Sequence, residues 1–135
     1  RFGYAIAQAD LISGLVKVKD SYNVDAVAIA VATAAIKDQQ YFRQTTEKVK
    51  KARDLLTEQL RALKFEVPRS YSNFVLAETK SCQAKVIYDK LVQRNIYVRY
   101  FDLPGLENKL RITVGTEQQN DKVILALKEI IERSD

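Results

Sequence analysis

The chain has 135 residues, of which 47% are hydrophobic and 29% charged, and its net charge is +5. These values are typical of one soluble globular domain, or of one domain with part of another, and the interleaving of basic with acidic residues makes nucleic-acid binding unexpected. The absence of histidine, the single cysteine and the lack of a long apolar run exclude histidine-dependent catalysis, an internal disulfide and a membrane span within the chain.

The first 37 residues are predicted to contain one strand and two helices. Residues 3–7 are predicted to form a short buried strand, and Asp10 is placed to cap a helix over residues 11–18. Residues 24–36 are rich in alanine and valine, so a helix there is apolar on nearly every face and is normally covered. Because this part of the chain offers little to cover such a helix, we interpret residues 1–37 as a helical fragment of a larger α/β domain.

Residues 38–135 are predicted to form a small α/β domain. It begins with a long helix from Asp38 to about Lys64, in which apolar residues recur at three- and four-residue steps. Strands and helices then alternate, which favours a sheet of three or four strands with helices packed on it. The predicted strands cover residues 65–67, 73–77, 96–98 and 110–114, and the later predicted helices cover residues 82–94 and 117–133.

Polar residues mark the expected ends of the last two helices. Ser81 is placed to cap the helix over residues 82–94, and Asn95 suits the left-handed conformation that often follows a helix. Thr116 and Gln119 have the spacing of a capping box, in which each side chain bonds to the backbone N–H of the other residue. These signals predict where both helices begin and where the first of them ends.

Arg111 lies in the middle of the last predicted strand. Because side chains alternate along a strand, Leu110, Ile112 and Val114 face one way, and Arg111 faces the other way with Thr113. An arginine among core residues is costly unless its charge finds a partner, and its planar fork suits a carboxylate or a phosphate. Arg111 is therefore a candidate anion-binding residue. The alternative is an arginine that extends its charge into solvent.

Three further residues are open to more than one interpretation. Arg99 follows the predicted strand over residues 96–98, where α/β proteins place ligand contacts, although a solvated surface arginine is the simpler interpretation. Asn73 begins a strand after a turn, where asparagine commonly satisfies the local backbone. Arg1 is uninformative by its position alone, because a first residue is normally frayed. The residues by themselves thus predict an α/β fragment with an anion-binding arginine.

Four segments together resemble fold-type I, pyridoxal-phosphate-dependent aminotransferases, and in particular the histidinol-phosphate aminotransferase family. Residues 106–120, with the run Leu-Arg-Ile-Thr-Val-Gly-Thr, are similar to the C-terminal motif of that family. Residues 99–101 fit the same family, and residues 72–76 resemble its small-domain strand. Residues 1–4 resemble the segment that follows the cofactor lysine. The resemblance runs over essentially the whole chain.

This resemblance implies the fold class and the domains. Residues 38–135 are expected to be the C-terminal small domain of an α/β, fold-type I transferase, with helices on a sheet of three or four strands. Residues 1–37 are expected to be a fragment of its large cofactor-binding domain. The lysine that forms the Schiff base is expected upstream of Arg1, so no catalytic residue is expected here and the chain alone is expected to be inactive.

The resemblance also implies roles for the candidate residues. Arg111 would bind the α-carboxylate of the substrate, and Arg99 would lie near the distal, phosphate-bearing end of the substrate. Asn73 would lie near the domain junction beside the same site. Arg1 would bind the phosphate group of the cofactor.

The implied reaction is a ping-pong amino transfer between L-histidinol phosphate and 2-oxoglutarate, with pyridoxal 5'-phosphate as cofactor. The implied partners are an amino-acid phosphate, a 2-oxo acid and a second copy of the protein in a homodimer. No metal, nucleic acid or membrane is expected, and the expected compartment is the cytoplasm. Two alternatives stay open: a related phospho-amino-acid decarboxylase, and a noncatalytic module that binds anions or a partner chain.

Overall fold

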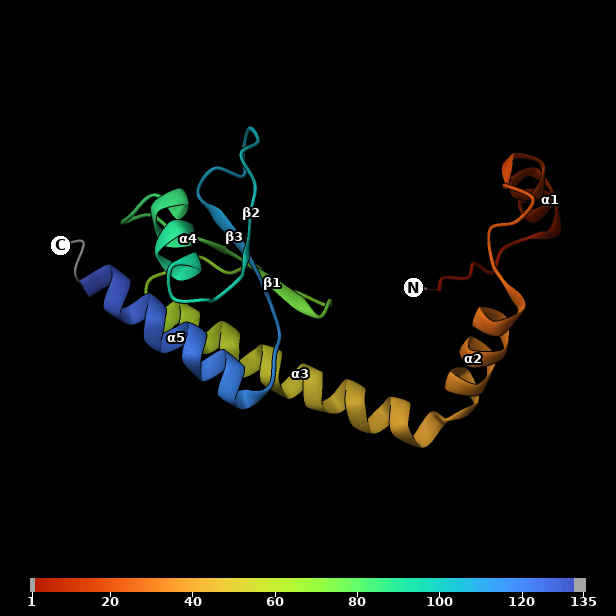
Figure 1. The fold of residues 1–135 in the computed structure, drawn as a ribbon, viewed down its shortest axis with the longest axis horizontal. Coiled ribbons are helices and arrows are strands. Elements are labelled where there is room, and N and C mark those ends of the chain that lie inside the picture. The colour runs from red at the N-terminus through yellow and green to blue at the C-terminus, as the bar shows by residue number, and fades with distance from the viewer. Residues whose placement is uncertain (1, 133–135) are drawn as a thin grey trace. The chain divides into compact units, whose positions relative to one another are not determined.

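The computed structural model describes residues 2–132, and the chain divides into two compact units, residues 1–44 and 45–135. In chain order the elements are α1 (Ala9–Val18), α2 (Ala26–Lys37), α3 (Gln39–Ala62), β1 (Phe74–Glu78), α4 (Ala84–Val92), β2 (Arg99–Tyr100), β3 (Lys109–Thr113) and α5 (Glu117–Glu132) (Figure 1). The boundary between the two units falls within α3. The predicted domain boundary, between residues 37 and 38, falls just before this helix and stays a prediction.

The first unit contains α1 and α2, and neither helix has a buried residue. The strand predicted over residues 3–7 is wrong, because these residues are exposed and have no strand partner among the described residues. The predicted cap of α1 is also wrong. Gln8 occupies the N-cap without a side-chain hydrogen bond, and Asp10 lies in the first turn, where a carboxylate favours the helix through the helix dipole.

Helix α2 confirms the predicted apolar helix. Asp25 is its N-cap, and the carboxylate accepts a hydrogen bond from the backbone N–H of Ala28 at 2.8 Å. Two valines one turn apart, Val27 and Val31, are 72% and 63% exposed. The first unit by itself therefore leaves much of its apolar surface uncovered. No helix in the described part of the chain is long and apolar enough to cross a membrane.

The second unit is built on an antiparallel sheet with the strand order β1-β3-β2, so β3 is the central strand. The register places Leu76 of β1 and Arg99 of β2 on either side of Arg111 in β3. Backbone pairing of β1 with β3 continues beyond the strand ends, where the Val114 N–H donates to the Asn73 carbonyl at 2.8 Å. Arg111 is thus held from both sides by neighbouring strands.

The strand predicted at residues 65–67 is reduced to one bridge. Glu66 and Glu78 exchange two backbone hydrogen bonds, at 2.9 and 2.8 Å, next to the outer edge of β1. Pro68, two residues after Glu66, lacks the backbone N–H that a longer ladder of hydrogen bonds would need. The sheet therefore has three strands in the described part of the chain, within the predicted three or four.

The strand predicted at residues 96–98 is displaced, because β2 begins only after it. The backbone of this segment is used to close α4 instead: the Ile96 N–H donates to the Leu91 carbonyl at 2.9 Å. Asn95 has φ 57°, which confirms the left-handed residue predicted after this helix. The segment that the apolar pattern assigned to a strand therefore begins with a residue whose backbone closes the end of α4.

The starts of α4 and α5 differ in how well the sequence predicted them. Ser81 does not cap α4, since Gln83 is the N-cap and makes no side-chain cap hydrogen bond. The capping box of α5 is confirmed: the Thr116 N–H donates to Gln119 Oε1 at 2.9 Å, and the Gln119 N–H donates to Thr116 Oγ1 at 3.4 Å. A Cβ at Gly115 would lie 2.9 Å from Gln119 Cβ, which is fixed to the backbone of α5, so the close approach of β3 and α5 at this junction favours glycine.

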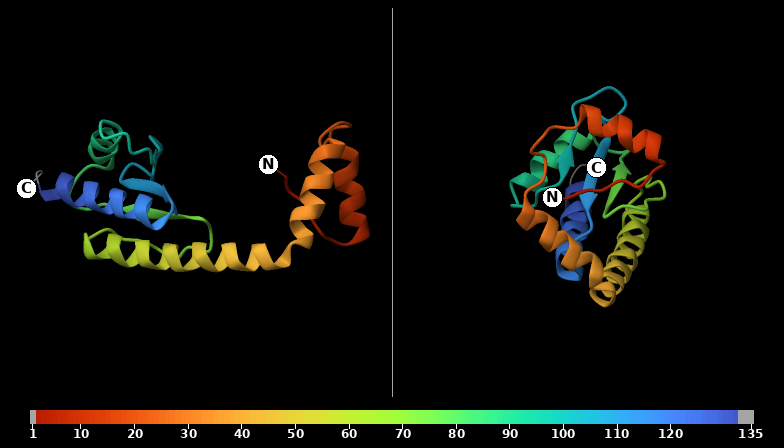
Figure 2. Two further views of the ribbon diagram at one scale, coloured as in Figure 1. Left: turned by 60° about the horizontal axis from the view of Figure 1, so that its bottom comes forward. Right: turned by 90° about the vertical axis from the view of Figure 1, so that its right-hand side faces the viewer.

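The helices cover one face of the sheet. Leu110 and Ile112 of β3 are buried together with Val75 and Ala77 of β1, which confirms the predicted alternation along β3. Figure 2 shows α3 and α5 running side by side in this part of the molecule. The fully buried helical residues packed with the sheet are Leu56, Leu60, Ala84, Ile87, Leu91, Leu127 and Ile130. The opposite face of the sheet, which carries Arg111, stays partly open to solvent.

This core predicts a large difference between two leucines of α5. Leu127 is fully buried, whereas Leu125 is 59% exposed. We expect Leu127→Ala to lower the free energy of unfolding by about 2–5 kcal/mol, because it leaves a cavity, and Leu125→Ala to lower it by less than about 1 kcal/mol. Urea unfolding followed by circular dichroism measures both values. Equal losses would contradict the assignment of the core.

The uncovered first unit predicts self-association of the 135-residue chain. We expect light scattering to give a mass above that of the monomer and a hydrophobic dye to bind, because α2 exposes apolar residues on many sides. The variant Val27→Glu/Val31→Lys places a favourable charge pair four residues apart and should reduce both signals without unfolding the helix. A wild-type chain that stays monomeric and binds no dye would disprove this expectation.

Candidate functional site

Two arginines lie directly opposite each other on the open face of the sheet. The register pairs Arg99 of β2 with Arg111 of β3, and opposite residues in an antiparallel pair have side chains on the same face. Like charges in this arrangement destabilise the pairing. The structure therefore brings together two of the residues predicted to bind substrate, at an energetic cost that an anion between them would remove.

Two aromatic rings surround the guanidinium of Arg111. Its Cζ lies 5.2 Å from the ring centroid of Phe74 and 5.8 Å from that of Phe101. The Cζ of Arg99 lies 5.2 Å from the same Phe101 ring. The face of an aromatic ring is electronegative and attracts a cation within about 6 Å. The cluster of Arg99, Arg111, Phe74 and Phe101 is called the arginine pair site below.

The arginine pair site lacks an acidic partner among the described residues. Neither guanidinium forms an ion pair there, and Arg111 Nε is buried without a hydrogen-bond partner. Leaving a charged donor buried and unsatisfied is costly. A carboxylate or phosphate could accept from the planar fork of Arg111 in a bidentate manner. The site is therefore suited chemically to one or two anionic groups.

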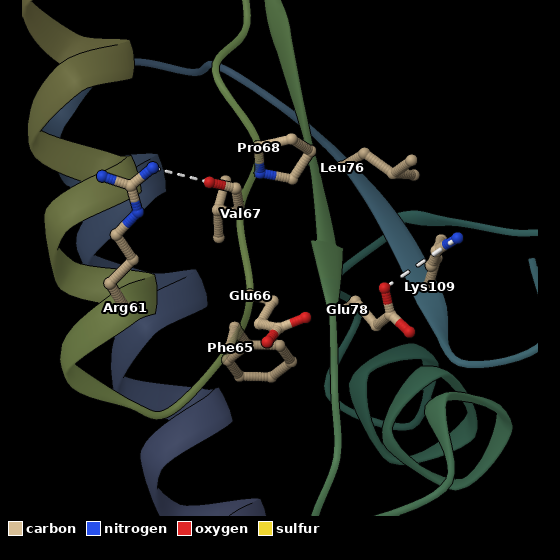
Figure 3. Close-up of a pocket in the computed structure, with 8 residues that line it drawn as sticks. All are labelled: Arg61, Phe65, Glu66, Val67, Pro68, Leu76, Glu78 and Lys109. Atoms are coloured by element: carbon tan, nitrogen blue, oxygen red, sulfur yellow. Dashed lines mark hydrogen bonds and ion pairs between the residues drawn. The ribbon is translucent and has the colours of Figure 1, made fainter.

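The charges farther along the same sheet face are partnered. Lys109 Nζ lies 3.9 Å from a Glu78 carboxylate oxygen and donates to the Gly105 carbonyl at 2.7 Å. Both side chains line an open hollow of about 560 Å³ together with Leu76, which pairs with Arg111 (Figure 3). The other residues lining the hollow are Arg61, Phe65, Glu66, Val67 and Pro68. This hollow adjoins the arginine pair site, but Lys109 is ion-paired in it and Arg61 donates to the Val67 carbonyl at 2.6 Å.

An exposed ion pair lies beside this hollow. Lys80 donates to Glu66 at 2.5 Å, and this hydrogen bond, with the attraction of the two charges, raises the pKa of Lys80 above its usual value. Lys80 stays protonated over the physiological pH range and its charge is held by Glu66. It therefore provides no neutral amine for Schiff-base chemistry.

Asn73 lies apart from the two arginines. Its main-chain carbonyl pairs with β3, and it precedes Phe74, so alternation directs its side chain away from the face that carries Arg111. It lines a separate hollow of about 250 Å³ with residues of α3, including Val49 and Arg53. The predicted substrate role of Asn73 stays a prediction.

Arg1, predicted to bind the cofactor phosphate, lies outside the described residues, so its role also stays a prediction. Among residues 2–132, no three histidine, cysteine or acidic side chains gather closely enough to hold a metal ion. The rings of Phe74 and Phe101 were not predicted as site residues. Phe101 stands two residues after Arg99, and this even spacing was the one sequence signal that could have placed both on one face.

An α/β unit that offers two free guanidiniums on one sheet face fits a domain that binds anionic substrates. The sequence pattern of the family named Aminotransferase class I and II matches residues 1–127, and this chain belongs to that family.

Two relatives from different organisms carry the same name. The chain is 47% identical over 135 residues to histidinol-phosphate aminotransferase 1 of Nostoc sp., covering all of this chain and 38% of that protein. It is 44% identical over 137 residues to histidinol-phosphate aminotransferase 1 of Oceanobacillus iheyensis, covering 99% of this chain and 39% of that protein. The chain thus spans a little over a third of the length of these relatives.

Solved structures confirm the fold. The histidinol-phosphate aminotransferase of Clostridium acetobutylicum matches 92% of this chain and 38% of that chain, with a TM-score of 0.81 at 24% identity. The enzyme of the same name from Sinorhizobium meliloti, solved in complex with pyridoxal-5'-phosphate, matches 91% of this chain and 34% of that chain, with a TM-score of 0.78 at 23% identity. The predicted fold class, part of a fold-type I aminotransferase, is confirmed.

The arginine pair site predicts stabilisation of the chain by anions. We expect inorganic phosphate to raise the free energy of unfolding relative to chloride at equal ionic strength, by about 1.4 kcal/mol at ten times its dissociation constant. Arg111→Gln should abolish this gain, because it removes the fork with the unpartnered Nε. Arg69→Gln, which changes an exposed arginine of the same unit, should retain it. A gain that survives Arg111→Gln would place the anion elsewhere.

Proposed function

We propose that this chain is the substrate-binding part of a pyridoxal-phosphate-dependent aminotransferase that acts on L-histidinol phosphate and 2-oxoglutarate. The observation that carries the proposal is the arginine pair site, where Arg99 and Arg111 lie opposite each other without an acidic partner among the described residues. The family and the names of the relatives support the same reaction.

In this proposal Arg111 binds the α-carboxylate of glutamate and 2-oxoglutarate, and it binds the phosphate that stands in place of this carboxylate, one carbon from Cα, in L-histidinol phosphate. Its half-buried guanidinium donates two parallel hydrogen bonds, which fixes both the position and the plane of the carboxylate. Such a grip limits the orientations in which Cα can present its proton and its amino group. Arg111 therefore acts through positioning, and the chemistry at Cα takes place on a substrate that it holds.

Arg99 supplies the second cation of the site. Glutamate and 2-oxoglutarate carry a second, distal carboxylate for it. L-Histidinol phosphate has no carboxylate and a single anionic group, the phosphate ester on the carbon bonded to Cα, which Arg99 helps Arg111 to hold. Because Arg99 is exposed, its long side chain is free to adjust to either group. A single pair of arginines thereby serves both halves of a ping-pong reaction, in which two different substrates must use the same site in turn.

The proposed cofactor is pyridoxal 5'-phosphate, which when bound withdraws electrons from Cα and carries the amino group between the two substrates. The residue assigned to its phosphate, Arg1, lies outside the described residues, and the donors on the open sheet face suit substrate anions. Because the chain spans a little over a third of its relatives, we propose that it acts within a larger enzyme. That enzyme is proposed to be a cytoplasmic homodimer.

A chimera tests this function. In it, the chain replaces the matching stretch of the Nostoc sp. relative, with which it aligns over its whole length. We expect the chimera to transfer the amino group of L-histidinol phosphate to 2-oxoglutarate. Arg111→Gln should lower kcat/KM by roughly 10²-fold or more, because the substrate loses a bidentate charged contact. Arg69→Gln should leave kcat/KM within about twofold.

The chimera also separates the alternatives. Release of carbon dioxide from a phospho-amino acid, without amino transfer, would favour the decarboxylase. A folded chimera with neither activity, beside an active Nostoc sp. parent, would favour a noncatalytic module. Either result would overturn the proposed amino transfer.

A further inference from the structure

Phe101 contacts both members of the arginine pair. Its ring centroid lies 5.2 Å from Cζ of Arg99 and 5.8 Å from Cζ of Arg111. These distances place one ring within cation–π range of two guanidiniums that repel each other. Phe101 is half-buried and does not belong to the hydrophobic core of the unit. Its contacts with the arginines are thus a more specific explanation of its position than core packing.

The geometry gives Arg111 more support than Arg99. Phe74 of β1 lies diagonally opposite Arg111 and contributes a second ring at 5.2 Å, whereas Arg99 has a ring contact with Phe101 alone among the described residues. Arg111 is therefore held between a ring of β1 and a ring of the segment that follows β2. Arg99 is exposed, and its position depends on the one ring that it shares with Arg111.

An aromatic ring positions a guanidinium without occupying its hydrogen-bond donors. A carboxylate in the same place would accept the N–H groups and neutralise the charge. A ring attracts the cation through its face and leaves the N–H groups available. This difference explains how the arginine pair can be held in place and still lack an acidic partner among the described residues.

We propose that Phe101 is a positioning residue that holds the two guanidiniums side by side before substrate binds. The proposal deepens the proposed function and rests on it for the identity of the substrates. Because both cations are preset, an anionic ligand that contacts both of them does not have to immobilise two long side chains on binding. Phe101 should therefore act on the affinity for both substrates and little on the chemical step.

The first test needs no activity. In the 135-residue chain, the heteronuclear NOE of the arginine side-chain Nε–H groups reports how rigid each guanidinium is. We expect Phe101→Leu to mobilise Arg99 strongly and Arg111 partly, since Arg111 keeps Phe74, and Phe101→Tyr to keep both rigid. Tyr97→Leu, an exposed aromatic of the same segment, is the matched control and should change neither. Equal rigidity in Phe101→Leu and wild type would overturn the proposal.

The second test uses the chimera with the Nostoc sp. relative. Phe101→Leu should raise KM for L-histidinol phosphate and for 2-oxoglutarate by about fivefold and leave kcat within about twofold. Phe101→Tyr should restore both KM values, and Tyr97→Leu should match wild type. A fall in kcat that tyrosine does not rescue would indicate a merely structural role and would overturn the proposal.

The two tests distinguish separate failures. A wild-type chimera without amino transfer, beside an active parent, contradicts the proposed function. The rigidity measurement on the 135-residue chain still decides the role of Phe101 in that case, because it depends on the arginines and the ring alone.

Discussion

The central strand β3 is the constraint on which the second unit depends. Its neighbours pair with it on both sides, so the alternation of its side chains is fixed for the whole sheet. Leu110 and Ile112 are buried against the helices, so the side chain of Arg111, which lies between them in the strand, must point to the other face of the sheet. A slip of one residue would expose both apolar side chains and bury the charge. The core therefore determines where the guanidinium stands, and the same contacts that stabilise the fold present the candidate site.

The cations on the open face of the sheet differ in whether they have an acidic partner. Lys109 is neutralised by Glu78 and by a backbone carbonyl, as surface charges commonly are. Arg99 and Arg111 face each other with rings beside them and without an acid among the described residues. An acidic residue at the arginine pair would relieve the repulsion and improve stability. Its absence there is the pattern expected where a binding site has been kept at the expense of stability.

Several features that depend on neighbouring residues could be predicted from the sequence. The capping box of Thr116 and Gln119, the left-handed Asn95 and the outward-facing Arg111 all follow from local spacing, and all are confirmed. Other local signals failed, since Asp10 and Ser81 do not cap their helices. Residues 3–7 look like a strand but find no partner strand, and residues 96–98 are apolar but close a helix. The pairing of Arg99 with Arg111, and hence the shared ring, required the register between β2 and β3, which no local pattern specifies.

The spacing of two cations on one rigid sheet has a consequence for selectivity among the many small anions of a cell. A lone anion can engage either guanidinium at once but gains nothing from the other. A molecule whose two anionic groups match the spacing binds the second cation as an intramolecular event, at a high effective concentration. Discrimination then resides in the distance between the charges and hardly in the strength of either contact. Antiparallel pairing across β2 and β3 thus favours a dicarboxylate whose charges match this spacing, whereas a phosphate monoester such as L-histidinol phosphate gains its affinity from the guanidiniums that reach its one phosphate group.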